Sequence, residues 1–126
     1  MILVFGGAYQ GKLDYAIKRF VLTEDDIYRC AEGNVTCPSG GAIVYEADKW
    51  ILSLLCAKKD VAKETEQFLR ENRGSIVICN DISCGVVPID PLMRQWREEM
   101  SKFMGQLARN ADEVVRVYCG IPTRLK

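Results

Sequence analysis

The chain has 126 residues, of which 48% are apolar and 27% are charged, with 17 basic and 17 acidic side chains. This is the composition of an ordinary globular domain, and the balanced charge gives no field that would attract nucleic acid or an anionic membrane surface. Two glycines stop the apolar residues 1–5, which argues against a secretory signal, and no run is long enough to span a bilayer. We therefore expect one cytoplasmic domain covering residues 1–126, with no nucleic-acid or membrane partner.

The first part of the chain begins with a predicted strand and a predicted helix. Residues 2–5 form a short apolar run typical of a buried strand, and residues 11–22 have helical periodicity. The pattern is weaker over the next segment, where residues 23–26 are candidates for a capped turn, residues 27–30 for a brief strand and residues 37–41 for a turn.

Three further strands and two longer helices are predicted in the rest of the chain. Short runs rich in β-branched residues indicate strands over residues 42–45, 75–79 and 114–118. One apolar stripe predicts a helix over residues 48–73 with Gly74 capping its end. A second stripe predicts a helix over residues 92–110, with Asp90 as N-cap and Pro91 as the first helical residue.

These strands are continuously apolar and alternate with amphipathic helices. A half-exposed antiparallel strand would instead alternate polar and apolar residues. The pattern therefore predicts an α/β protein with a mainly parallel sheet flanked by helices.

Six cysteines are scattered along the chain, and there is no histidine. They are Cys30, Cys37, Cys56, Cys79, Cys84 and Cys119, and none forms a C-x-x-C pair. A disulfide scaffold or a zinc site is therefore not expected. Cys79 and Cys119 end apolar strand-like runs and Cys56 falls on an apolar helix face, so these three are interpreted as small hydrophobes.

A glycine-rich segment joins the first predicted strand to the first predicted helix. It reads Gly6, Gly7, Ala8, Tyr9, Gln10, Gly11 and Lys12, followed by Leu13. Glycines allow backbone amides to converge on phosphate oxygens, the helix N-terminus adds positive potential, and Lys12 can reach the terminal phosphates. The alternative is a structural turn with an exposed lysine, but the position between strand and helix favours a nucleotide-binding P-loop. The α/β protein is therefore expected to be a single P-loop-type domain.

Leu13 departs from the complete P-loop pattern, which has Ser or Thr at this position. That hydroxyl ligates the Mg²⁺ that bridges the nucleotide phosphates, and leucine has no oxygen to offer. We therefore expect Mg²⁺ binding to be weakened. Binding of phosphate by the loop amides does not require the hydroxyl, so nucleotide affinity can outlast catalysis.

Two acidic residues follow predicted strands, at the edge where ligands of parallel sheets bind. Glu46 ends the run over residues 42–45, and Asp81 closely follows residues 75–79. Either carboxylate could hold a metal-bound water or accept a proton from an attacking hydroxyl. The alternative for each is a solvated loop or helix-cap carboxylate.

These segments together resemble the bifunctional adenosylcobinamide kinase and adenosylcobinamide-phosphate guanylyltransferase family of cobalamin biosynthesis. The resemblance covers residues 1–8 with Gly11 and Lys12, and the strand that ends in Glu46. In the C-terminal third, the residues in the family's order and spacing are Asn80, Asp81, residues 85–88, Leu92, Arg94, Arg97, residues 111–114 and Gly120.

The resemblance implies a site with particular ligands and residues. A nucleoside triphosphate, ATP or GTP, is expected on residues 6–12, with Glu46 near a metal ion and residues 80–88 forming a loop beside the site. It also implies a corrinoid substrate, adenosylcobinamide, and subunits that associate into a homo-oligomer.

The chain also departs from the family at three places. The segment between residues 22 and 41 is much shorter than in the family, and it lacks the histidine that accepts GMP in family members. Without histidine no phosphoramidate on an imidazole can form, so guanylyl transfer would need another route. Ser or Thr is usual where this chain has Leu13, and glutamate where it has Asp81.

Three functions remain open from the sequence. The first is a kinase that transfers the γ-phosphoryl group of ATP or GTP to a corrinoid hydroxyl, using Lys12 with Glu46 or Asp81. The second is a nucleotide- or corrinoid-binding relative without phosphoryl transfer, which regulates or supports a pathway enzyme. The third is a P-loop kinase or phosphohydrolase for another small molecule.

Overall fold

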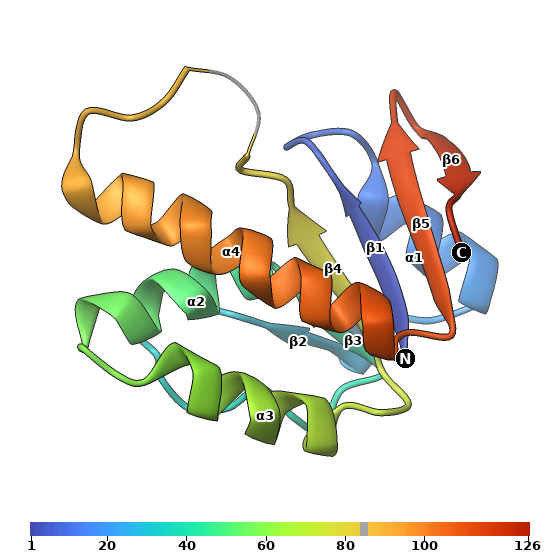
Figure 1. Ribbon diagram of the computed structural model, residues 1–126. Coiled ribbons are helices and arrows are strands. Elements are labelled where there is room, and N and C mark those ends of the chain that lie inside the picture. Colours follow the sequence, from blue (N-terminus) through green and yellow to red (C-terminus); the bar gives the residue numbers. More distant parts are fainter. Residues whose placement is uncertain (84–85) are drawn as a thin grey trace.

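The computed structural model describes residues 1–83 and 86–126, so Cys84 and Gly85 lie outside the described residues. A six-stranded sheet forms its centre, with the strand order β2-β3-β4-β1-β5-β6 (Figure 1). The strands are β1 (Ile2–Gly6), β2 (Ile27–Arg29), β3 (Ile43–Tyr45), β4 (Ile76–Asn80), β5 (Glu113–Tyr118) and β6 (Ile121–Arg124). The α-helices among the described residues are α1 (Lys12–Phe20), α2 (Ala47–Cys56), α3 (Val61–Glu71) and α4 (Pro91–Asn110).

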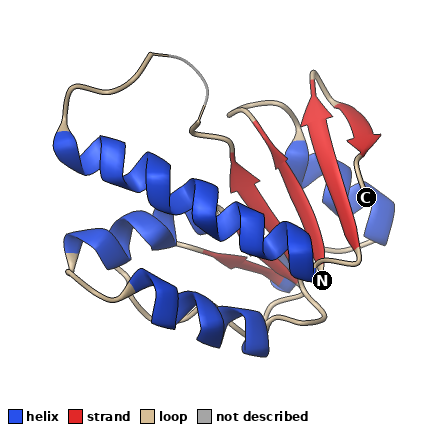
Figure 2. Cartoon of the chain, in the orientation of Figure 1, coloured by secondary structure: helices blue, strands red, loops and turns tan. Residues whose placement is uncertain are grey.

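Strands β1 to β5 run parallel to one another, and β6 pairs antiparallel with β5 at the sheet edge. The parallel strands are buried on both faces because helices cover each side, which explains their continuously apolar sequences. Figure 2 shows the helices on either side of the sheet. The predicted α/β class with a mainly parallel sheet is confirmed.

The two faces of the sheet build two apolar layers of unequal size. Helix α1 covers one face, where Ala16 packs against Val4 and Ile78. Helices α2, α3 and α4 cover the other face. Their contact centres on three aromatic rings, Trp50, Phe68 and Phe103, with centroids between 5.2 and 6.0 Å apart. Aromatic pairs at this separation add to the stability gained from burial alone.

The connections of the sheet create a crevice between β1 and β4. From β1 the chain passes through α1 to β2 at the far edge, whereas from β4 it passes through α4 to β5 on the other side of β1. The two neighbouring strands therefore send their connections in opposite directions. In open α/β sheets, ligands bind outside the carboxyl ends of the strands at such a switch point.

The single helix predicted over residues 48–73 is wrong, because this segment forms α2 and α3. Lys58 adopts a left-handed backbone with φ of 56°, which ends the first helical path. The side chain of Asp60 then accepts a hydrogen bond from the Lys63 N–H and starts α3. Gly74 does not cap the end, because α3 stops at Glu71 and Asn72 is its C-cap.

Other local predictions had mixed outcomes. Asp90 caps α4 by accepting from the Leu92 N–H at 2.8 Å with Pro91 as the first helical residue, as predicted. The brief strand expected at residues 27–30 is β2, and residues 24–26 form a capped 3-10 turn. Strand β6 was not predicted. Cys79 is buried, but Cys56 and Cys119 are exposed, so their interpretation as buried hydrophobes is wrong.

Within the described residues, none of the helices combines the length and the apolar character that crossing a membrane requires.

Candidate functional site

The carboxyl ends of β1, β3 and β4 surround a pocket of about 340 Å³. It is lined by Ala8, Tyr9, Gln10, Gly11, Lys12, Leu13, Asp14, Tyr45, Glu46, Lys49 and Asn80. We call it the carboxyl-edge pocket. It brings the predicted P-loop together with Glu46, which lies 34 or more residues further along the chain, at the switch point of the sheet.

Close backbone packing holds the glycine-rich loop in place. A Cβ atom on Gly6 would lie 2.3 Å from the carbonyl oxygen of Val117, so only glycine fits against β5. Gly11 has a φ of 86° and begins α1 as its N-cap residue. At the top of the loop, the Gln10 side chain accepts a hydrogen bond from the Cys119 N–H at 2.6 Å, and its carbonyl accepts from Gly120 at 2.9 Å.

The backbone N–H groups of the loop are available to a ligand. Among the described residues, no N–H of residues 7–12 donates a hydrogen bond to another protein atom. These groups precede and open α1, so their partial positive charges add to that of the helix N-terminus. Amides left unpaired in such a turn form a concave site for an anion.

Lys12 is the buried cation of this pocket, with only 5% of its surface exposed. Its Nζ donates to the Gly7 carbonyl at 2.6 Å. Burial lowers the pKa of the Lys12 ammonium, and the negative charge of Asp48 is the largest opposing influence. No ion pair within 4.0 Å engages Lys12 in the described part of the chain, so its charge is uncompensated at short range and suited to a phosphate.

Glu46 lies between β3 and α2 and carries a left-handed backbone, with φ of 60°. Its Oε2 atom is 2.6 Å from Nζ of Lys49, one turn along α2. Hydrogen bonding to Glu46 raises the pKa of Lys49, so this side chain stays protonated. Glu46 thus enters the pocket as half of an ion pair.

Asp81 lies beside the loop but on a different pocket. Its backbone N–H donates to the Gly6 carbonyl at 2.8 Å, which ties β4 to the start of the loop. Its carboxylate accepts from the N–H of Ser83 at 3.0 Å and from the Ser83 hydroxyl at 2.5 Å. The pocket that Asp81 lines has about 210 Å³ and includes Phe5, Met100 and Met104. Of the predicted catalytic residues, Lys12 and Glu46 therefore share a pocket and Asp81 lines its neighbour.

Sequence reasoning missed two residues at the pocket, Asp48 beside it and Lys49 in its lining. Asp48 is buried, and its two carboxylate oxygens accept from the backbone and side-chain N–H groups of Asn80 at 3.1 and 3.3 Å. Burial raises the pKa of Asp48. Lys49 is the other. Both follow Glu46 directly, but sequence reasoning assigned them only to the start of a helix.

The residues around the pocket do not match the donor set of a Mg²⁺ site. Mg²⁺ prefers oxygen ligands from carboxylates, hydroxyls and water. Leu13 supplies no oxygen and packs against the apolar layer under α1. Of the carboxylates that line the pocket, Glu46 is paired with Lys49 and Asp14 is paired with Lys18 at 2.9 Å. A metal ion at either carboxylate would compete with the lysine that is bound to one of its oxygens.

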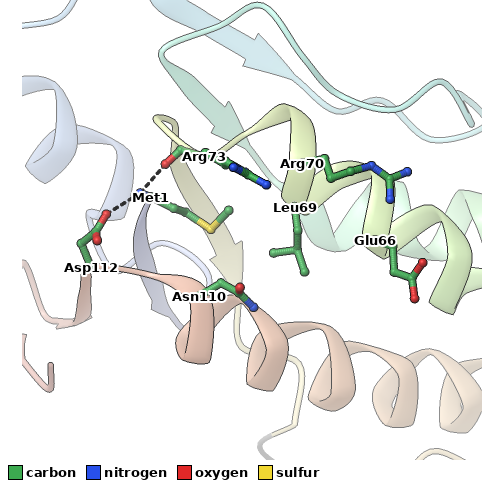
Figure 3. Close-up of a pocket in the computed structure, with 7 residues that line it drawn as sticks. All are labelled: Met1, Glu66, Leu69, Arg70, Arg73, Asn110 and Asp112. Carbon is green, nitrogen blue, oxygen red and sulfur yellow. Dashed lines mark hydrogen bonds and ion pairs between the residues drawn. The ribbon is translucent and has the colours of Figure 1, made fainter.

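A second and larger pocket, of about 510 Å³, lies at the opposite edge of the sheet, beside the amino ends of β1, β4 and β5. We call it the amino-edge pocket; it is lined by Met1, Glu66, Leu69, Arg70, Arg73, Asn110 and Asp112 (Figure 3). The Met1 amino group donates to the Arg73 carbonyl at 2.5 Å and to the Asp112 carboxylate at 2.8 Å. Among the residues that the structure describes, those that line it belong to no strand-to-helix loop.

Comparison with known proteins bears on the carboxyl-edge pocket. The sequence model of the cobinamide kinase / cobinamide phosphate guanyltransferase family matches residues 39–125, more than half of the chain. The matched range includes Glu46, Asn80 and Asp81 and begins after the loop at residues 6–12. No curated protein matches the sequence. The chain belongs to the cobinamide kinase / cobinamide phosphate guanyltransferase family.

Proposed function

We propose that the chain binds the phosphates of ATP or GTP on residues 6–12 and transfers the γ-phosphoryl group to a hydroxyl of a corrinoid, adenosylcobinamide. The proposal is carried by the loop at residues 7–12, whose N–H groups donate to no protein atom among the described residues and which ends in the buried Lys12. Membership of the cobinamide kinase / cobinamide phosphate guanyltransferase family supports the corrinoid as acceptor.

The transfer would use a small number of groups of this chain. Amides of residues 7–12 and Lys12 hold the phosphates and stabilise the charge that accumulates on their oxygens. The acceptor hydroxyl oxygen bonds to the γ-phosphorus while the bond to the β,γ-bridging oxygen breaks, and ADP or GDP leaves. Glu46 is the acid we assign to the hydroxyl proton, because it lines the same pocket as Lys12. Asp81 stays a prediction as an alternative acceptor of that proton.

The guanylyl transfer of the family is not part of this proposal. The chain contains no histidine, so it cannot form a phosphoramidate intermediate on an imidazole. We further propose that the protein works in the cytoplasm, and that it forms a homo-oligomer, as the family resemblance implies.

A second candidate function is nucleotide or corrinoid binding without transfer. The observations that favour it are Leu13 at the position of a metal-ligating hydroxyl and the ion pair that occupies Glu46. Such a protein would keep the phosphate cradle and support or regulate a catalytic partner.

Calorimetry with ATP and GTP, followed by a turnover assay with adenosylcobinamide, tests both candidates. Binding that weakens ~10- to 100-fold in Lys12→Ala supports the phosphate site, because a charge-assisted contact contributes about 1.5–3 kcal/mol. Formation of phosphorylated corrinoid supports the kinase. Saturated nucleotide binding without turnover supports the second candidate, and turnover with a different hydroxylated acceptor would reassign the substrate. Unchanged affinity in Lys12→Ala would remove the loop as the phosphate site.

A further inference from the structure

Lys49 places a second ammonium in the carboxyl-edge pocket. It lines the same pocket as Lys12 and is bound to Glu46 at 2.6 Å. Because Lys49 lies on α2 and Lys12 lies on α1, the two cations approach the pocket from different helices. The pocket is therefore lined by one lysine from the end of the loop and by another from α2.

The acid that holds Lys49 is the one that would otherwise be available to a metal ion. Glu46 follows the carboxyl end of β3, on the rim of the pocket. An ammonium bound to Oε2 of Glu46 competes with a metal ion for this carboxylate, because it already neutralises the charge that would attract the metal. Leu13 stands where a hydroxyl would supply a further metal ligand. Two separate positions, Leu13 and Glu46, are therefore both unfavourable for a metal ion.

We propose that Lys49 takes the electrostatic role of Mg²⁺, so that this pocket binds nucleoside triphosphates without a metal ion. The ammonium of Lys49 bridges Glu46 and the phosphate oxygens, while Lys12 and the loop amides hold the phosphates from the other side. An ammonium provides three hydrogen-bond donors, enough for one carboxylate and two phosphate oxygens. The inference rests on the proposed nucleotide site at residues 6–12.

Calorimetric titration with ATP in the presence of Mg²⁺ and in the presence of EDTA tests the inference. We expect the dissociation constants of the unchanged protein to agree within ~3-fold between the two conditions. Lys49→Met should weaken binding in EDTA about 10-fold, the effect of losing one charge-assisted contact. It should also make the affinity depend on Mg²⁺, because Glu46 is released. Lys49→Gln, which keeps a polar side chain without the charge, should behave in the same way.

Lys102→Met is the matched control. Lys102 forms an ion pair with Glu99 at the same three-residue spacing, but on the surface of α4. It should leave the ATP affinity unchanged in both conditions. The inference is overturned if the unchanged protein binds ATP only with Mg²⁺, or if Lys49→Met has no more effect in EDTA than Lys102→Met. Absence of ATP binding in both conditions would instead overturn the nucleotide site itself.

Discussion

The two edges of the sheet carry pockets that differ in what their walls can do. The amino-edge pocket is larger, about 510 Å³ against about 340 Å³ for the carboxyl-edge pocket. It contains Arg70 and Arg73 but also Glu66 and Asp112, and none of the described helices begins in it. The smaller pocket has a loop of unpaired amides, the start of α1 and a buried lysine. Backbone donors and a helix start, rather than volume, are therefore the features on which we base the proposed phosphate site.

The largest expected effect is the loss of stability when a side chain is added to Gly6, which packs closely against β5. Gly6→Ala puts a Cβ atom 2.3 Å from the Val117 carbonyl oxygen, and backbone atoms cannot move aside cheaply. We expect the free energy of unfolding to fall by ~3 kcal/mol or more in urea denaturation. The control is Gly105→Ala on α4, where the nearest atom is 3.5 Å away at the end of the Arg109 side chain. An equal loss in both variants would contradict the close packing at Gly6.

Nucleotide affinity separates the two pockets directly. Lys12→Ala should weaken ATP binding by at least ~10-fold, because it removes a buried charge from the phosphates. Arg73→Ala removes a cation from the amino-edge pocket and should leave the affinity unchanged. Calorimetry measures both, and melting temperatures show whether either protein has lost its fold. The opposite ranking would assign the nucleotide to the amino edge.

Asp48 gives the carboxyl edge a particular pH dependence. Burial raises the pKa of the folded carboxyl above its ordinary value of 3.8, so the folded state binds this proton more tightly than the unfolded chain does. The free energy of unfolding should therefore fall as pH rises from that value through the raised pKa of the folded protein. Asp48→Asn cannot titrate and should lack this decline. Urea denaturation over a pH series compares the two proteins, and parallel curves would show that Asp48 does not contribute.

The smallest expected effect concerns α3, which forms one wall of the amino-edge pocket. Asp60→Ala removes the side chain that accepts from the Lys63 N–H at 3.3 Å and should cost about 1 kcal/mol of stability. ATP affinity should not change, because no residue of α3 lines the carboxyl-edge pocket. Lys59→Ala, at the exposed neighbouring position, is the control. Weakened ATP binding in Asp60→Ala alone would mean that the two edges are coupled.

Sequence patterns revealed the scaffold of the carboxyl edge well. The strands β1, β3, β4 and β5 could be predicted because strands buried on both faces leave continuous apolar runs. Asp90 and Pro91 marked the start of α4 by local chemistry alone. The position of the glycine-rich loop between a strand and a helix could also be predicted from local sequence. These signals are local, so they can be recognised without knowing which segments are in contact in the folded protein.

The features that were missed depend on contacts between segments distant in the sequence, or on short segments that interrupt a helical pattern. Strand β6 has four exposed residues, one of them proline, and it forms only by pairing with β5. The end of α2 at residues 57–60 interrupts an apolar stripe that continues in α3. The contact between Asp48 and Asn80 joins residues 32 positions apart. The ion pair of Lys49 with Glu46 was missed because Glu46 was treated as a metal ligand and Lys49 only as part of the start of a helix.

A crystal structure with a non-hydrolysable ATP or GTP analogue tests the central claim most directly. The account predicts phosphate oxygens on the backbone N–H groups of residues 7–12, with Lys12 and Lys49 both in contact with them. Phosphates bound instead beside Arg70 and Arg73 at the amino edge would contradict it.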